Sequence, residues 1–233
     1  GNSLAQFFAC YVNAKESEGE EMWEKSYQQV LGMIDRMELE CGKCPNIRIA
    51  KNASQIRENQ REGRISAVLT VEEGGVLNGK QERIRTLYEK GIRLITLTWN
   101  YENCLGAPNS RDASVMEKGL TEFGIRTVGE MNRLGMLIDV SHLSDGGFWD
   151  CIRHSDKPVI ASHSNARVLC PHPRNLSDAM LRALAEKGGV VGLNFYPVFL
   201  KEQADQVSLQ DLARHAKYMI ETAGEELPAL GSD

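Results

Sequence analysis

The 233-residue chain lacks several features by which whole classes of protein are recognised. It contains no run of eighteen apolar residues, so the sequence predicts no membrane-spanning helix. No GxGxxG follows an apolar run, which leaves a dinucleotide-binding Rossmann sheet without support. Fixed-period repeats, low-complexity stretches and Gly/Ser linkers are also missing, and their absence favours one domain over residues 1–233.

Positive charge and cysteine are scarce as well. Lys and Arg number 27 against 32 Asp and Glu, a net charge of −5 that argues against non-specific binding to nucleic acid or anionic membranes. Six cysteines are too few for a disulfide scaffold at this length. The single CxxC, Cys41-Gly-Lys-Cys44, follows a helical segment and has no second pair, so we predict free thiols at a helix end. This usage is of the intracellular type, and a cytoplasmic location is the expectation. No basic n-region opens the chain, but the chain starts inside an apolar stretch, so that absence carries little weight.

Short apolar runs alternate with longer helix-periodic segments. The runs, rich in Val, Ile and Leu, cover residues 4–12, 65–71, 92–98, 136–140, 158–161, 190–194 and 229–232, with a weaker one at 47–50. Such runs are typical of parallel strands buried on both faces. Between them, apolar residues recur every three or four positions, and Ser54, Ser177 and Ser208 are candidate helix caps. This α/β alternation leaves two outcomes, an open doubly wound sheet or a (β/α)₈ TIM-type barrel.

The positions of the polar residues favour the barrel. Glu73, His142, His163 and Asp233 each come just after an apolar run. In a barrel the carboxyl ends of all strands lie on one rim, where two carboxylates and two imidazoles make a divalent-metal site. Taken singly, Glu73 fits a solvated loop acid equally well, and Arg174 fits a surface arginine better than a substrate contact.

Several motifs together carry a resemblance to a known family. They lie in family order along nearly the whole chain: Val71-Glu72-Glu73-Gly74-Gly75, Leu97-Thr98-Trp99-Asn100, residues 135–142 ending in Asp139-Val-Ser-His142, residues 161–166 containing Ser162-His163, Pro173-Arg174-Asn175, Asn194-Phe-Tyr196 and Gly231-Ser-Asp233. The chain resembles the renal (membrane) dipeptidase family of zinc metallopeptidases, within the amidohydrolase superfamily. The segments around His142, His163 and Arg174 are the most specific.

The resemblance implies a metal-dependent dipeptidase that hydrolyses the peptide bond of dipeptides through a metal-bridging hydroxide. It implies two zinc ions in the complete enzyme, with Glu73 as the carboxylate that bridges them. His142 and His163 match the histidines of one metal site. Asp233 matches an aspartate that ligates near the other metal and carries the proton.

For the substrate, the resemblance implies that Arg174 grips the C-terminal carboxylate of a dipeptide and that Tyr196 lines the pocket. The family's renal members carry a histidine, thought to contact the substrate carbonyl oxygen, where this chain has Trp99. We assign Trp99 to the pocket edge and expect a different substrate range, with plain packing as the alternative. The resemblance also suggests a homodimer.

Two departures from the family bear on completeness. The family's metal-binding His-x-Asp after its first strand has no counterpart before residue 4. The only such pair, His154-Ser-Asp156, precedes a predicted strand and is expected on the opposite rim. Seven strand candidates stand where a barrel needs eight, so we expect a barrel incomplete at both ends, lacking its first strand and its C-terminal part. This chain alone is then expected to hold at most one zinc tightly. A non-catalytic binding barrel, or an amidohydrolase acting on another amide, is the alternative.

Overall fold

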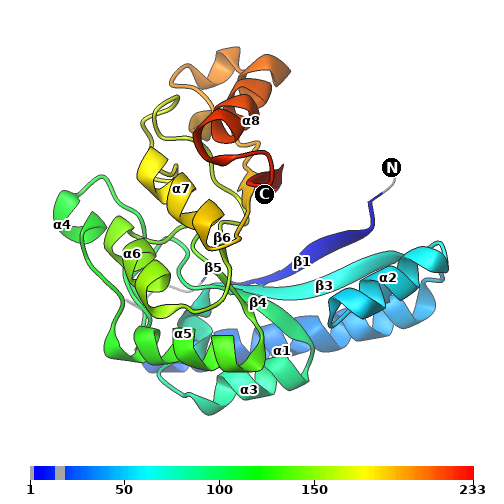
Figure 1. The fold of residues 1–233 in the computed structure, drawn as a ribbon. Helices are drawn as coiled ribbons and strands as arrows, with labels where there is room; N and C mark the ends of the chain where they lie inside the picture. The colour runs from blue at the N-terminus through cyan, green and yellow to red at the C-terminus, as the bar shows by residue number, and fades with distance from the viewer. Residues whose placement is uncertain (1–2, 14–18) are drawn as a thin grey trace.

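The computed structural model describes residues 3–13 and 19–233. Parallel strands form a curved sheet, and its members follow one another in chain order (Figure 1). The strands are β1 (Ala5–Tyr11), β3 (Ile65–Glu72), β4 (Ile92–Thr96), β5 (Leu137–Asp139), β6 (Val159–Ile160), β7 (Val191–Leu193) and β8 (Pro228–Leu230). An isolated bridge between Ala161 and Val191 connects the first five of these to the β7–β8 pair. The short β2 (Ile47–Ile49) pairs only with the start of β3.

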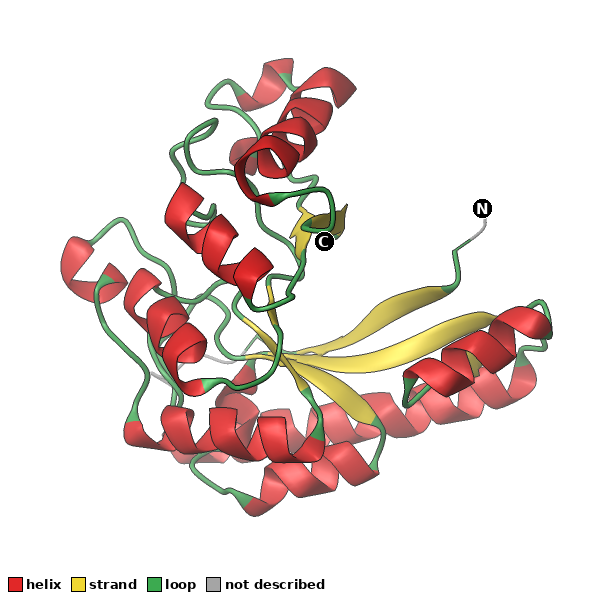
Figure 2. Ribbon diagram, in the orientation of Figure 1, coloured by secondary structure: helices red, strands yellow, loops and turns green. Residues whose placement is uncertain are grey.

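Helices connect successive strands and lie on the outer side of the curve (Figure 2). They are α1 (Gly19–Lys43), α2 (Ala53–Arg61), α3 (Glu82–Glu89), α4 (Ala113–Met116), α5 (Glu122–Leu134), α6 (Asp145–His154), α7 (Asp178–Glu186) and α8 (Leu209–Ala223). The described loops contain three 3₁₀ turns, η2 (Gly74–Leu77), η3 (Pro197–Phe199) and η4 (Ala204–Gln206). None of the described helices has the length and apolar character needed to cross a lipid bilayer.

The strands form where apolar residues are buried on both faces. In β3 the six residues between Ile65 and Glu72 are all buried, since strands lie on both sides and helices cover the outer face. One hydrophobic core cluster runs from Cys10 in β1 to Leu227 beside β8. The parallel arrangement is that of a (β/α)₈-type barrel, as the sequence predicted, seen here as an arc of seven strands from β1 to β8.

Local caps fix the helix ends. Ser177 accepts a hydrogen bond from the Met180 amide at the start of α7, and Ser208 forms the predicted capping box with Asp211 at the start of α8. The prediction for α2 was wrong by two residues. Its cap is Asn52, whose Oδ1 accepts the Gln55 amide at 3.0 Å, because Asn52 is the residue with extended backbone before the first turn.

Candidate active site

The carboxyl ends of β3, β5 and β6 bring together Glu72, His142 and His163. The two Nε2 atoms of the histidines lie 2.9 Å apart, and Glu72 Oε1 lies 3.5 Å from His142 Nε2 and 3.7 Å from His163 Nε2. Both imidazoles are buried, and the Glu72 side chain is 15% exposed. Within residues 3–13 and 19–233, this is the one group of three metal-binding side chains whose donor atoms lie within 4.8 Å of one another.

Hydrogen bonds fix the tautomer of each histidine. Ser162 Oγ gives its only proton to Asp139 Oδ2 at 2.5 Å, so it accepts a hydrogen bond from the Nδ1–H of His163 at 2.7 Å. His142 Nδ1 lies 3.3 Å from Asn100 Oδ1, an acceptor, and therefore also carries a proton. Each Nε2 is then unprotonated and can offer its lone pair to a metal ion, and the two lone pairs face the same point.

Asp139, at the end of β5, anchors this arrangement of the histidines through hydrogen bonds. Its carboxylate accepts hydrogen bonds from the Ser141 amide at 3.0 Å, the Ser162 amide at 2.8 Å and Thr96 Oγ1 at 2.6 Å, besides Ser162 Oγ. A fully satisfied buried carboxylate of this kind acts as a rigid anchor for the hydroxyl that orients His163. Sequence reasoning treated Asp139 only as part of a motif and missed this role.

The metal cluster contains Glu72, whereas the sequence analysis assigned Glu73. Successive side chains of a strand point to opposite faces, so only one of the two adjacent acids can face the histidines. Glu72 pairs with Tyr11 in the β1–β3 ladder and faces inward. Glu73 has left-handed backbone with φ 97°, and its buried carboxylate accepts hydrogen bonds from the Gly75 amide, the Trp99 amide and Asn103 Nδ2. Glu73 thus anchors the loop after β4.

The close packing after Glu73 explains the two glycines of that motif. A Cβ on Gly74 would lie 2.7 Å from the Leu97 carbonyl oxygen, and one on Gly75 would lie 2.3 Å from the Trp23 ring. Only residues without a side chain allow the turn to approach β4 and α1 this closely. His142 also has left-handed backbone, with φ 67°, and its carbonyl oxygen accepts both the backbone and side-chain N–H groups of Asn109 at 2.7 and 2.8 Å.

Burial and charge suit the cluster to a cation. Burial, together with the neighbouring carboxylates of Asp139 and Asp233, raises the pKa of Glu72 to about 7. Burial, with the nearby Arg174 charge, lowers the pKa of His142 and of His163, so both imidazoles are neutral at pH 7. Two facing lone pairs beside a buried carboxylate repel one another, and a cation between them would remove that repulsion. The donor set therefore fits a divalent metal ion.

Asp233 and Arg174 lie beside the cluster. Asp233 Oδ1 is 4.0 Å from His163 Nε2, its Oδ2 accepts a hydrogen bond from Asn194 Nδ2 at 3.0 Å, and its side chain is 42% exposed. Arg174 is buried, and its Nη2 donates to the His163 carbonyl oxygen at 3.0 Å. Burial lowers the pKa of Arg174 to about 10, so the guanidinium stays charged at neutral pH. Its Nε has no hydrogen-bond partner among the described residues.

The remaining predicted contacts occupy the edges of the site. The Trp99 ring lies 6.2 Å from the His142 ring, centroid to centroid, and is therefore beside the metal cluster. Tyr196 is 54% exposed and packs on Phe199 at 5.1 Å, and the Arg174 guanidinium lies 5.3 Å from the same Phe199 ring. Tyr196 and Arg174 thus both approach the Phe199 ring.

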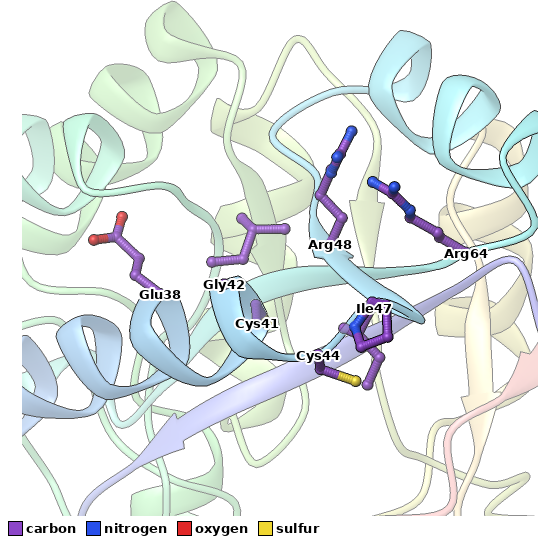
Figure 3. Close-up of a pocket in the computed structure, with 9 residues that line it drawn as sticks. Glu38, Cys41, Gly42, Cys44, Ile47, Arg48 and Arg64 are labelled. Carbon is purple, nitrogen blue, oxygen red and sulfur yellow. The ribbon is translucent and has the colours of Figure 1, made fainter.

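The other end of the strands holds a separate pocket, between the end of α1 and β2 (Figure 3). Cys41 and Cys44 line it as free thiols at the end of α1, which confirms the prediction for this motif. Its two arginines, Arg48 and Arg64, both pair with Glu62, at 3.3 and 3.0 Å. His154 likewise belongs to the amino-terminal side of β6, at the end of α6, as expected for a His-x-Asp pair unrelated to the metal cluster.

The chain is similar to known proteins over its whole length. Residues 1–233 match the membrane dipeptidase family, Peptidase family M19. The chain is 38% identical over 196 residues to an uncharacterized protein of Klebsiella pneumoniae from the pqqA 5′ region, covering 80% of this chain and 71% of that one. It is 34% identical over 241 residues to an uncharacterized dipeptidase of Schizosaccharomyces pombe, covering 100% of this chain and 58% of the yeast protein.

A solved crystal structure has the same fold as this chain. The crystal structure of a metallo peptidase from Rhodobacter sphaeroides, liganded with a phosphinate mimic of the dipeptide L-Ala-D-Ala, has a TM-score of 0.88 and 28% identity. The match covers 97% of this chain and 72% of that structure. The chain therefore belongs to the membrane dipeptidase family of metallopeptidases. It spans 58% of the length of the yeast relative, somewhat more than half.

Proposed function

We propose that the protein to which this chain belongs is a zinc-dependent dipeptidase. The observation that carries the proposal is the cluster of Glu72, His142 and His163 with a buried, charged Arg174 beside it. Family membership and the dipeptide mimic bound by the Rhodobacter sphaeroides relative support the same reading.

Glu72, His142 and His163 would hold the metal ion, with Glu72 in the bridging role that sequence reasoning gave to Glu73. Two imidazole nitrogens and one carboxylate are the donor set of many zinc sites that keep one position open for water or substrate. A divalent ion there would lower the pKa of a bound water and polarise the scissile carbonyl. Asp139 and Ser162 hold the His163 ring in the orientation that this binding needs.

Arg174 would bind the C-terminal carboxylate of the substrate. Its guanidinium offers a planar fork of donors, and its buried Nε lacks a partner among the described residues, so an incoming carboxylate would satisfy it. A further residue attached at the C-terminus would convert this carboxylate into a peptide bond and remove the partner of Arg174. The site therefore selects substrates with a single residue after the scissile bond, as in a dipeptide.

Asp233 would move the proton. It lies 4.0 Å from His163 and is the partly exposed carboxylate beside the cluster, so it can take a proton from the attacking water and give it to the leaving amine. Asn194 holds its second oxygen at 3.0 Å and thereby orients the first oxygen toward the site.

Steady-state kinetics on the full-length protein with zinc supplied would test these roles. We expect Arg174→Ala mainly to raise KM, and Asp233→Asn to lower kcat by about a hundredfold, on the order of 3 kcal/mol of barrier. The substrates are a plain dipeptide and its C-terminal amide. Equal turnover of amide and free acid by the unmutated protein would contradict the role of Arg174 and favour another amidohydrolase substrate.

A further inference from the structure

Three aromatic side chains pack together on one side of the metal cluster. The Tyr11 and Trp99 rings meet edge to face with centroids 5.1 Å apart, and the Trp99 and Tyr101 rings do the same at 6.0 Å. Trp99 in turn lies 6.2 Å from the ring of His142. Tyr11 remains 37% exposed, and the other two rings are half-buried. We call Tyr11, Trp99 and Tyr101 the aromatic wall.

The strands that carry this wall precede, in the order of the sheet, the strand that precedes Arg174. Tyr11 ends β1 and pairs with Glu72 of β3, so the two side chains share the inner face of the sheet. Trp99 follows β4, His142 follows β5, and His163 and Arg174 follow β6. Along the order β1-β3-β4-β5-β6, Tyr11 and Trp99 therefore follow strands on either side of Glu72, whereas His142, His163 and Arg174 follow the last two strands.

This arrangement has a consequence for the substrate, which rests on the proposed dipeptidase function. A dipeptide whose carboxylate pairs with Arg174, and whose peptide carbonyl lies at the metal cluster, must project its N-terminal residue away from β6. That direction leads along His142 to Trp99 and Tyr11.

We propose that the aromatic wall is the subsite for the side chain of the N-terminal residue, and that it selects dipeptides carrying a large apolar or aromatic side chain there. Aromatic faces and edges bind such side chains by apolar burial and by edge-to-face contact, and they offer a small side chain such as that of glycine nothing to bury. The indole of Trp99 supplies the contact next to His142, and the two tyrosines extend it outward.

Two substrate series separate this subsite from the rest of the site. The first varies the N-terminal residue of X-Ala through Gly, Ala, Leu and Phe; the second varies the C-terminal residue of Ala-X through the same set. Trp99→Ala removes the wall next to His142, and Trp99→Phe keeps an aromatic ring there. Trp149, 36% exposed on α6 and packed on Phe148, gives the matched control Trp149→Ala.

The full-length protein with zinc is expected to hydrolyse Phe-Ala with a kcat/KM at least about tenfold above that for Gly-Ala, in line with the selectivity of apolar pockets. Trp99→Ala should bring that ratio close to one, Trp99→Phe should keep most of it, and Trp149→Ala should leave it unchanged. The Ala-X series should keep its order in all variants, because Arg174 and the C-terminal side of the site are untouched.

Several results would overturn the proposal. One is an unmutated protein that cleaves dipeptides but prefers Gly-Ala; another is a Trp99→Ala variant that lowers all X-Ala rates by one common factor. A change confined to the Ala-X series would mean that the aromatic wall contacts the C-terminal residue of the substrate and not the N-terminal one. If Trp99→Ala does not fold, Tyr11→Ala tests the same selectivity ratio. An unmutated protein that cleaves no dipeptide would instead refute the proposed function, and the subsite with it.

Discussion

Ser162 offers the sharpest test of how the metal site is held together. Its hydroxyl joins Asp139 to the His163 ring, with contacts of 2.5 and 2.7 Å. Ser164, on the other side of His163, is buried, and its Oγ has no hydrogen-bond partner among the described residues. Alanine at each position removes the same hydroxyl from the same loop, but only one of the two hydroxyls orients the histidine.

The expected magnitude follows from the contacts that are lost. Ser162→Ala leaves the His163 Nδ1–H without its acceptor, while Asp139 keeps hydrogen bonds from two backbone amides and Thr96. Loss of such an outer hydrogen-bond partner typically weakens metal binding by about 10–100-fold. That range corresponds to about 1.4–2.8 kcal/mol of binding free energy. Stability of the metal-free protein should fall by about 1–3 kcal/mol, because a buried donor loses its partner.

Calorimetric titration of zinc into the metal-free protein measures the affinity, and urea unfolding measures the stability. Ser162→Ala should bind zinc about 10–100-fold more weakly, and Ser164→Ala should stay within about twofold of the unmutated protein. Ser162→Thr, which keeps the hydroxyl, should recover most of the affinity. The reasoning fails if Ser162→Ala binds zinc normally, or if the two alanine variants lose affinity equally.

Three further predictions concern the neighbouring groups. Glu72→Gln should abolish tight zinc binding without lowering the stability of the metal-free protein. Glu73→Gln should instead cost about 1–3 kcal/mol of that stability, because it disrupts three hydrogen bonds of the Glu73 carboxylate. Calorimetry and urea unfolding would show whether the two effects separate. Metal analysis of this chain should find at most one tightly bound zinc, lost on His142→Ala, and two equivalents would contradict the donor count. His215 accepts the Ala166 amide at Nδ1 and donates to a carbonyl through Nε2, and burial lowers its pKa, so it is neutral when folded. The free energy of unfolding should therefore fall as pH drops below about 6.5, and this group contributes at most about 1.4 kcal/mol per pH unit. Urea unfolding across this pH range, with a chelator present to keep the protein metal-free, measures that slope. An equal slope for His215→Gln would refute the assignment.

Most of the fold could be predicted because its signals are local. Strands buried on both faces leave continuous apolar runs, and helix caps such as Ser177 satisfy nearby amides, so both can be recognised without knowledge of tertiary contacts. The rim position of His142 and His163 followed from the same runs, since parallel strands all end on one side.

The choice between Glu72 and Glu73 could not be made that way. In a strand buried on both faces the apolar pattern does not alternate, so it carries no information about which face the last residue takes. Pairing with Tyr11 of β1, 61 residues earlier in the chain, sets the inward face of Glu72. Asp139 and Ser162 were missed for a related reason. Their contact joins two strands, and the only sequence signal was a Ser before each histidine.

The left-handed backbone at Glu73 and His142 has a consequence for laboratory evolution. Each of these residues holds a conformation that costs a side-chain-bearing amino acid about 1–3 kcal/mol, and only glycine adopts it freely. Glycine at either position would relieve that strain but remove a metal donor or a loop anchor. At Glu73 glycine would also lose three hydrogen bonds, so screens that select for heat resistance alone are expected to enrich substitutions at His142 and return inactive proteins. A selection scheme for this protein needs to score turnover in every round.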